Sequence, residues 1–364
     1  MKLAINLTLS GAMLALCAWL VWPDRGTRAD VALAIEHISV GDLVPYVGLL
    51  VIVQLARSLR WNNLLAPLGV RVPTGPLLAI SAVGFMAILA LPARLGEFVR
   101  PGLLRKRGDV SAAAALGTVA VERIVDGLLI SLFVFGALFA HRDEQSPGWM
   151  MPMAYAALGV FSAALVFLLF ALRWPEQTVA FCVRLTLLPR FAPRVGRLIN
   201  DKMLDMVRGF VVLRDRKNIA IFVVWSVAYW GANGLGVYVL AHAFGLPLSV
   251  IGAFATMGVV GVGIMLPNTP GLVGQFVYCM LLGVGLYLGF DPDVDKHLLV
   301  SGANAVQHDL YAKAYAFCTL HYLMQVGWYV LCGALGLLTP WVSFHDLWTS
   351  RKVAPDPTVD SNAA

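Results

Sequence analysis

The sequence predicts an all-α, polytopic membrane protein. Of its 364 residues, 59% are hydrophobic and 13% are charged, and the mean hydropathy is +0.77. These values lie far outside the range of soluble domains. Apolar runs of about 20 residues recur along the chain, and this is the length that crosses the hydrocarbon layer as a helix. Because lipid offers no hydrogen bonds, a spanning backbone must satisfy its own polar groups, as a helix does.

The elements expected in the membrane are the long apolar stretches. The first begins after Lys2, is long enough to span and has no small-x-small cleavage site after it, so we expect a retained helix. The stretches cover residues 4–22, 43–65, 76–92, 112–140, 152–172, 219–241, 251–266, 271–289 and 312–339. Plain hydropathy therefore predicts about eight spans.

The basic residues indicate how many of these stretches cross. If all of them span, the basic run at 94–107 lies opposite the arginines at 57–71, against the positive-inside rule. The conflict disappears if 76–107 is a re-entrant hairpin from the cytoplasm and 251–289 is another from outside. Six full spans then remain, both termini are cytoplasmic, and 21 of the 27 Lys and Arg residues lie inside. This pattern predicts a bacterial inner (cytoplasmic) membrane protein.

An inverted repeat follows from this layout. Each half contains, in order, two spans, a hairpin and a third span; the halves cover about residues 1–145 and about 150–340. Because three crossings leave the chain on the opposite side of the membrane, the second half is inverted relative to the first. The motif Leu-Pro-x-x-x-Gly occurs in both hairpins, and Pro and Gly both end helices. The predicted helix breaks are Pro92, Gly96, Pro267 and Gly271. Inverted repeats with broken helices are typical of transporters; chance recurrence in a Leu- and Gly-rich chain is the alternative.

The chain is expected to form one transmembrane domain over residues 1–349. A tail at 350–364, rich in Pro, Asp and Ala, is expected to be disordered. Residues 195–213 place apolar and charged residues on opposite faces at helical spacing, which predicts an interfacial helix joining the halves. The five cysteines lack metal-like spacing and mostly fall in apolar runs, so neither a disulfide nor a zinc site is expected.

Three charged residues lie in the middle of one expected span. Glu122, Arg123 and Asp126 are inside the 112–140 run, where an ionisable side chain costs roughly 2.5–3.5 kcal/mol. Glu122 and Asp126 share a helical face, and Arg123 lies beside them. Because this helix carries two acids and one base, we expect another arginine to meet it. Structural ion pairing and a substrate or gating role both fit this pattern.

A second group of charges follows the first hairpin break. Arg94, Glu97 and Arg100 recur every three residues and form a face of alternating sign, which predicts a second layer of the same network. The turn of the second hairpin is polar and flexible, and freed amide hydrogens there are candidates for anion binding. Its residues are Asn268, Pro270, Gly271, Gly274 and Gln275.

Arg57, Arg60 and Trp61 end the second expected span. Arginine can fork onto a phosphate, and tryptophan can sit at the level of the headgroups. We therefore assign these residues to headgroup binding or to the membrane interface. Snorkelling of the two arginines to the surface is the alternative.

The sequence contains no catalytic constellation. It has no Walker motif, no HExxH, no defensible Ser-His-Asp order and no large soluble domain. We therefore expect neither an ATP-driven pump nor an enzyme, and no cofactor or metal. The net charge of +6 fits orientation signals and contact with anionic lipids rather than nucleic-acid binding.

Four ordered motifs resemble one known family. They are R-S-L-R-W at 57–61, L-P-A-R-L-G-E-F-V-R at 91–100, V-E-R-I-V-D at 121–126 and P-N-T-P-G-L-V-G at 267–274. Together they resemble the lysylphosphatidylglycerol synthase transmembrane, or flippase-like, family over roughly residues 40–340. In the bifunctional synthases this domain passes the aminoacylated lipid to the outer leaflet. Stand-alone relatives are linked to glycolipid, polyprenyl-linked and hopanoid pathways.

The resemblance also implies which charges function and what is missing. The family's functional charges correspond to Arg94, Glu97, Arg100, Glu122, Arg123 and Asp126. The aminoacyl-transferase domain of the bifunctional enzymes has no counterpart, so this chain is expected to make no lysyl-lipid. Gln275 stands where many relatives have an acid, which argues against a lysyl-lipid substrate.

The sequence therefore predicts a translocator that moves an anionic phospholipid, glycolipid or isoprenoid-linked lipid between leaflets. The alternatives are a membrane-embedded enzyme or accessory subunit of lipid or lipid-linked sugar biosynthesis, and a structural scaffold. The expected partners are membrane lipids and lipid-biosynthesis enzymes, with no nucleic acid. Glu122 and Arg94 facing a lipid-open groove would favour transport, whereas a closed ion-pair core would favour a scaffold.

Overall fold

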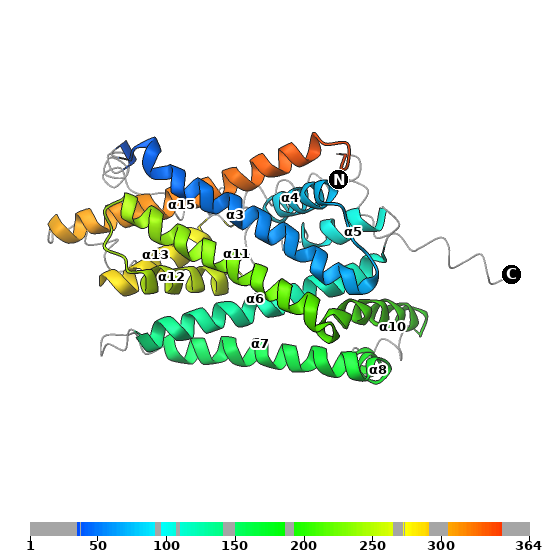
Figure 1. The fold of residues 1–364 in the computed structure, drawn as a ribbon. Coiled ribbons are helices and arrows are strands. Elements are labelled where there is room, and N and C mark those ends of the chain that lie inside the picture. The colour runs from blue at the N-terminus through cyan, green and yellow to red at the C-terminus, as the bar shows by residue number, and fades with distance from the viewer. Residues whose placement is uncertain are drawn as a thin grey trace, which may run out of the picture.

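The computed structural model describes residues 35–36, 38–91, 96–106, 110–140, 150–185, 193–264, 272, 274–290 and 305–343. Within these residues every regular element is a helix, as the sequence predicts, and Figure 1 shows an elongated bundle. The α-helices are α3 (Val40–Leu65), α4 (Thr74–Ala90), α5 (Val99–Lys106), α6 (Ala112–Ala140), α7 (Met150–Arg173), α8 (Pro175–Leu185), α10 (Pro193–Arg208), α11 (Arg216–Ala243), α12 (Val250–Gly263), α13 (Gln275–Leu288) and α15 (Ala305–Leu337). The 3-10 segments are η1 (Ala66–Leu68) and η3 (Gly209–Arg214).

Three of these helices are long and apolar enough to cross a membrane. They are α3 continued by η1, α11 and α15. A fourth candidate is α7 with α8, although the two are bent by 119°. α6 has 29 residues but carries Glu122, Arg123 and Asp126. The described part is therefore a multi-helical membrane protein with three or four candidate spans. The first expected span, 4–22, lies outside the described residues.

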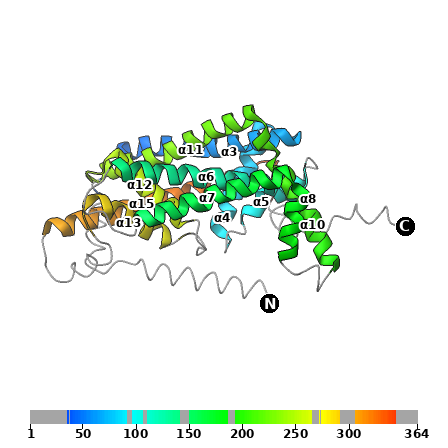
Figure 2. The ribbon, with the colours of Figure 1, turned by 90° about the horizontal axis from the view of Figure 1, so that it is seen from below.

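The chain turns sharply after α7. Pro175 begins α8, and because proline has no amide hydrogen it suits a helix start and cannot continue the helix before it. α7 therefore ends at Arg173, one residue beyond the expected span at 152–172. Figure 2 shows α8 and α10 together at one end of the bundle, directed across α7.

The helix expected at 195–213 is present as α10 followed by η3. Val195 and Leu198 are 45% and 52% exposed, so this helix presents apolar residues outward. A Cβ on Gly117 of α6 would overlap the backbone of Met206 on α10, and one on Gly209 of η3 would overlap the backbone of Ala114 on α6. The change from α to 3-10 geometry coincides with this docking point.

The central helices pack reciprocally between the two halves. α3 runs along α11, α4 packs on α15, and α12 packs on α6 (Figure 1). Small residues permit the contact of α12 with α6 and that of α4 with α15. A Cβ on Gly258 of α12 would overlap Val134 of α6, and one on Gly336 of α15 would press on Val83 of α4. Such close crossings are typical of helix packing in membranes.

The first expected hairpin consists of α4 and α5. Gly96 lies between them, and its φ is not positive. Instead, a Cβ there would overlap the backbone of Ala87 and Ile88 on α4. Glycine is therefore required because the chain folds closely back onto α4.

The second expected hairpin consists of α12 and α13, which pack against each other. Gly274, which precedes α13, has φ of 79°, a backbone conformation that favours glycine. The Gln275 side-chain amide donates a hydrogen bond of 2.7 Å to the Gly263 carbonyl. Gln275 thus ties the start of α13 to the end of α12.

Side-chain caps fix the starts of α3 and α11. Ser39 and Asp42 form a reciprocal capping box before α3. Asp215 accepts hydrogen bonds from the amides of Lys217 and Asn218 at the start of α11. The Asn218 side chain also donates to Asp215 at 2.7 Å, and these hydrogen bonds lower the pKa of the Asp215 carboxyl below its ordinary value.

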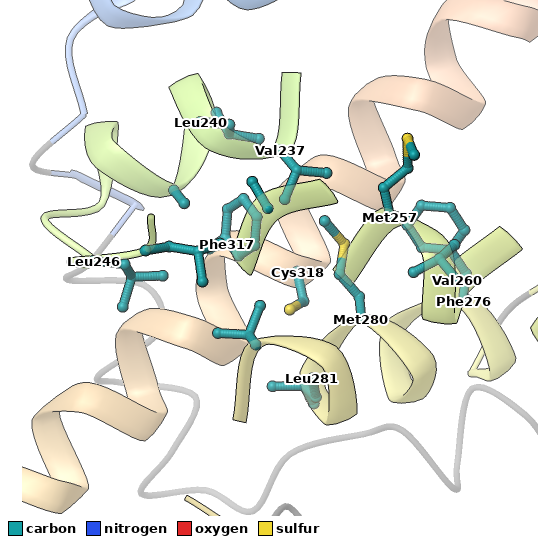
Figure 3. Close-up of a cluster of buried hydrophobic side chains, with 14 of the residues drawn as sticks. Val237, Leu240, Leu246, Met257, Val260, Phe276, Met280, Leu281, Phe317 and Cys318 are labelled. Atoms are coloured by element: carbon teal, nitrogen blue, oxygen red, sulfur yellow. The ribbon is translucent and has the colours of Figure 1, made fainter. Parts of the chain in front are cut away.

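The apolar core contains a large cluster where α11, α12, α13 and α15 meet. Figure 3 shows side chains from these four helices converging on one another. The labelled residues are Val237, Leu240, Leu246, Met257, Val260, Phe276, Met280, Leu281, Phe317 and Cys318. This cluster forms the apolar side of the cavity described below.

Candidate functional site

The site is built around Arg60 on α3, whose side chain is completely buried. Its two terminal nitrogens donate to the two carboxylate oxygens of Asp126 on α6, at 2.6 and 2.7 Å. This bidentate geometry is typical of strong charge-assisted pairs. Arg60 also donates to Glu122 at 2.9 Å and to Ser226 Oγ on α11 at 3.1 Å. One side chain therefore connects three helices.

Two more arginines contact Glu122. Arg100 on α5 donates to Oε2 at 3.0 Å, and Arg123 donates to Oε1 at 2.6 Å. One further arginine was expected to meet α6, and two do so: Arg60 from α3 and Arg100 from α5. We refer to Arg60, Arg100, Glu122, Arg123 and Asp126 as the ion-pair cluster. Removing one partner from a buried pair costs about 3–5 kcal/mol, because a buried charge is left unpaired.

Two indole groups extend the cluster. Trp230 Nε1 on α11 donates to Asp126 Oδ1 at 2.9 Å, and Trp61 Nε1 donates to Thr118 Oγ1 on α6 at 3.0 Å. Trp61 was expected at the level of the headgroups, but it is completely buried, because its N–H is satisfied inside the bundle. Arg60 is likewise completely buried and donates to two carboxylates, so it does not snorkel to the surface.

The position of Arg100 depends on a glycine. A Cβ at Gly84 on α4 would overlap Cγ of Arg100. The guanidinium of Arg100 also lies 4.8 Å from the Phe85 ring centroid and 5.1 Å from that of Trp61. α4 therefore provides the surface that directs Arg100 towards Glu122.

A cavity of about 110 Å³ lies beside the cluster. Residues from α3, α4, α6, α11, α12, α13 and α15 line it. Among the described residues, the charged ones that line it are Arg57 and Arg123. Its polar, uncharged side includes Tyr229, Asn233, His321, Gln325 and Tyr329. Five of the residues labelled in Figure 3 form part of its apolar side: Val237, Met257, Val260, Phe276 and Met280.

Arg57 faces this cavity and is half-buried. Its guanidinium carbon lies 3.6 Å from the centroid of the Phe85 ring and 5.6 Å from that of Tyr329. In the part of the chain that the structure describes, no carboxylate lies within ion-pairing distance of Arg57. Aromatic faces thus hold a cation that lacks a direct counter-ion there.

Arg123 connects the cluster to the cavity. Its side chain is 25% exposed, whereas that of Glu122 is 0% exposed. Glu97 lies near enough to attract Arg123 electrostatically. Arg123 is therefore the member of the cluster that both pairs with a carboxylate and lines the open space.

Several residues expected in the site have no described placement. These are Pro92, Arg94, Pro267, Asn268, Pro270 and Gly271. Among the described residues Glu122 is enclosed by three guanidiniums and does not face a lipid-open groove, the arrangement that would favour transport. By that criterion Glu122 belongs to a closed core, and the open space begins at Arg57, three residues before Arg60 on α3.

Sequence reasoning missed the uncharged part of the site. Asn233, His321 and Gln325 lie in apolar helices, and Gln325 contacts the other two at 3.4 and 3.2 Å. The rule that polar residues in spans need partners would have found these three residues. Phe85 carried no signal, since an aromatic residue in an apolar helix is ordinary.

Together the fold and the site define a class: polytopic α-helical membrane proteins with a buried charged cluster beside a cationic cavity. Comparison with family models matches residues 4–294 to the Lysylphosphatidylglycerol synthase TM region. The chain therefore belongs to this family, as its four motifs predict. The match ends before α15, whereas the expected resemblance extends to about residue 340. No curated protein and no solved structure matches this chain.

Proposed function

We propose that this protein is a lipid translocator that moves an anionic phospholipid, glycolipid or isoprenoid-linked lipid between the leaflets of a bacterial inner membrane. Family membership supports a role in lipid modification or translocation. The observation that carries the proposal is the cavity itself, which places Arg57 and Arg123 inside an apolar helical bundle. Such groups are costly in a membrane and mark substrate pathways.

The topology proposed for this function has six full spans, two re-entrant hairpins and an inverted repeat. α4 has 17 residues and α12 and α13 have 14 each, fewer than the about 20 needed to span. The reciprocal packing supports the repeat, because each hairpin packs on the last helix of the opposite half. Under this topology α3 and α11 are equivalent and meet at the centre.

The proposed orientation places both termini in the cytoplasm. α5, α8 and α10 all lie towards one end of the bundle, which brings two strongly basic parts of the chain to the same side (Figures 1 and 2). The positive-inside rule assigns that end to the cytoplasm.

In the proposed mechanism the ion-pair cluster and the cavity have different roles. Arg60 and Arg100 are engaged by carboxylates, so they hold α3, α5, α6 and α11 together instead of receiving a phosphate. The headgroup enters the cavity while the acyl chains stay in lipid, so no charge meets hydrocarbon unpaired. Rocking of one half against the other changes the side from which the cavity is reached.

Two other functions remain as alternatives. A scaffold is favoured by the complete enclosure of Glu122 and Asp126. An enzyme or accessory subunit acting on lipid-linked sugars requires an exposed acid, and the acidic segment 291–295 proposed for that role lies outside the described residues.

Leaflet exchange in proteoliposomes tests the proposal. Purified protein is reconstituted with fluorescent phosphatidylglycerol, and dithionite quenching measures exchange in the wild type, Glu122→Gln and Arg94→Ala. We expect exchange above that of protein-free liposomes, and its loss in both variants. Arg208→Gln serves as a control, because Arg208 is 75% exposed on α10. Absence of exchange with every anionic lipid tested would refute translocation.

A further inference from the structure

We propose that the cavity binds the headgroup of a phosphate-bearing lipid whose polar end is a small uncharged polyol, and that Arg57 contacts the phosphate. This inference rests on the proposed function and specifies its substrate class. It assigns phosphate binding to Arg57 instead of Arg60 and Arg100, because those two arginines are paired with carboxylates of the ion-pair cluster. The charge, the size and the lining of the cavity each support this assignment.

Charge indicates that an anion belongs in the cavity. Four guanidiniums gather around Glu122, and one further carboxylate lies near Arg123 beyond the two in the cluster. Among the described residues this group comprises Arg57, Arg60, Arg100 and Arg123 against Glu97, Glu122 and Asp126. One positive charge therefore remains, and Arg57 is the guanidinium without a paired carboxylate. The planar fork of an arginine matches the oxygens of a phosphate in bidentate geometry, so a lipid phosphate fits this position.

The arrangement of Arg57 fits a reversible contact. Its Nε is buried without a hydrogen-bond partner among the described residues, and the guanidinium plane rests near the Phe85 ring. A cation–π contact contributes about 0.5–2 kcal/mol, less than a buried ion pair. Arg57 therefore keeps the capacity to form hydrogen bonds with an incoming phosphate without first breaking a salt bridge.

Size limits the ligand to a headgroup. The cavity volume of about 110 Å³ is several times the about 10–15 Å³ that one water needs. It is well below the about 300–1,000 Å³ of pockets that enclose drug-sized ligands. The cavity thus accepts a phosphate with a small substituent, whereas acyl chains must remain outside it.

The uncharged lining favours hydroxyl groups. Asn233, Gln325 and Tyr329 are among the lining residues of the cavity. His321 also lines it, is 2% exposed, and has a buried Nδ1 without a partner among the described residues. Amide, imidazole and phenol groups can donate to and accept from the hydroxyls of a polyol.

The same lining disfavours a cationic headgroup. The described lining residues include no Asp or Glu. A lysyl-lipid would bring an ammonium group next to Arg57 and Arg123, and no carboxylate among the described lining residues would pair it. Desolvation without a partner opposes such binding.

Direct binding of short-chain lipids tests this inference. Isothermal titration calorimetry is performed on the full-length protein in uncharged detergent with dioctanoyl phosphatidylglycerol, phosphatidylethanolamine and lysyl-phosphatidylglycerol. We expect one phosphatidylglycerol per protein chain and about tenfold weaker binding of the other two lipids. Glycerol phosphate distinguishes a free phosphate ligand from a lipid, and we expect it to bind more weakly than phosphatidylglycerol because it lacks the acyl chains.

Three variants locate the binding site. Arg57→Gln should weaken phosphatidylglycerol binding about tenfold, because a charged hydrogen-bond donor to the phosphate is lost. Ile88→Trp fills the cavity without removing charge and should weaken binding as well. Arg208→Gln removes an exposed charge on α10 and should leave binding unchanged. Size-exclusion profiles and melting temperatures show whether each variant is folded.

Failure of the inference is distinguishable from failure of the proposed function. Equal binding of lysyl-phosphatidylglycerol, or binding unchanged in folded Arg57→Gln and Ile88→Trp, would overturn the inference even if leaflet exchange is observed. Selective, Arg57-dependent binding without leaflet exchange would support the headgroup site and refute translocation.

Discussion

The guanidinium of Arg60 on α3 binds both carboxylate oxygens of Asp126 on α6, at 2.6 and 2.7 Å. The two residues are 66 positions apart in sequence, and neither side chain is more than 1% exposed. This pair fixes the crossing of the two helices in the middle of the bundle. It also leaves Arg57, on the same helix, facing the cavity.

Arg60→Met should lower the free energy of unfolding by about 3–5 kcal/mol, because it leaves Asp126 and Glu122 buried with fewer counter-charges. Arg208→Gln breaks an exposed pair with Asp205 and should cost less than about 1 kcal/mol. Denaturant titration in detergent measures both changes. Similar small losses in the two variants would contradict a structural role for Arg60.

Gly84→Ala should destabilise the protein by about 1–3 kcal/mol, because the added Cβ overlaps Arg100 and pushes it away from Glu122. Gly48→Ala on α3 is the control, since a Cβ there meets nothing within 4 Å. It should be neutral or stabilising by up to about 1 kcal/mol. If the two variants have the same melting temperature, the proposed contact between α4 and Arg100 is wrong.

Trp230→Phe should destabilise the protein by about 1.5–3 kcal/mol, because it removes a hydrogen bond to the charged Asp126 while keeping an aromatic ring. Trp174→Phe, at a residue that is 43% exposed, should change stability much less. Thermal unfolding measures the loss of stability in each of the two variants. A larger loss in Trp174→Phe would show that Trp230 contributes little through its N–H.

Asp215 should make a pH-dependent contribution to the start of α11. Hydrogen bonds from Asn218 and Lys217 lower the pKa of its carboxyl below the ordinary value of about 3.9. The stabilisation is therefore fully present above that value and is lost as the pH falls through the lowered pKa. The difference in melting temperature between wild type and Asp215→Ala should shrink as the pH is reduced from about 6 to about 3. A constant difference would contradict the capping role.

The charged cluster could be predicted in part because its chemistry is visible in one helix. Glu122, Arg123 and Asp126 stand out in an apolar run, and their imbalance requires another arginine. The identity of that arginine is a matter of tertiary packing. Arg57 and Arg60 are three residues apart and share one side of α3, so periodicity cannot decide which of them meets α6 and which faces a cavity.

The helix breaks show the same limit. The sequence correctly indicates that Gly96 and Gly274 lie where apolar runs are interrupted. At Gly274 the reason is positive φ, whereas at Gly96 it is close contact with the backbone of α4. Contacts between distant segments leave no local pattern, which is also why the burial of Trp61 was not predicted.

Translocation through the Arg57 cavity is tested most directly by leaflet exchange of fluorescent phosphatidylglycerol in proteoliposomes containing wild type, Arg57→Gln or Arg208→Gln. We predict rapid exchange with wild type and Arg208→Gln, and about tenfold slower exchange with a folded Arg57→Gln protein, because the headgroup loses its phosphate contact. Wild-type exchange no faster than that of protein-free liposomes, or an Arg57→Gln rate equal to the wild-type rate, would contradict it.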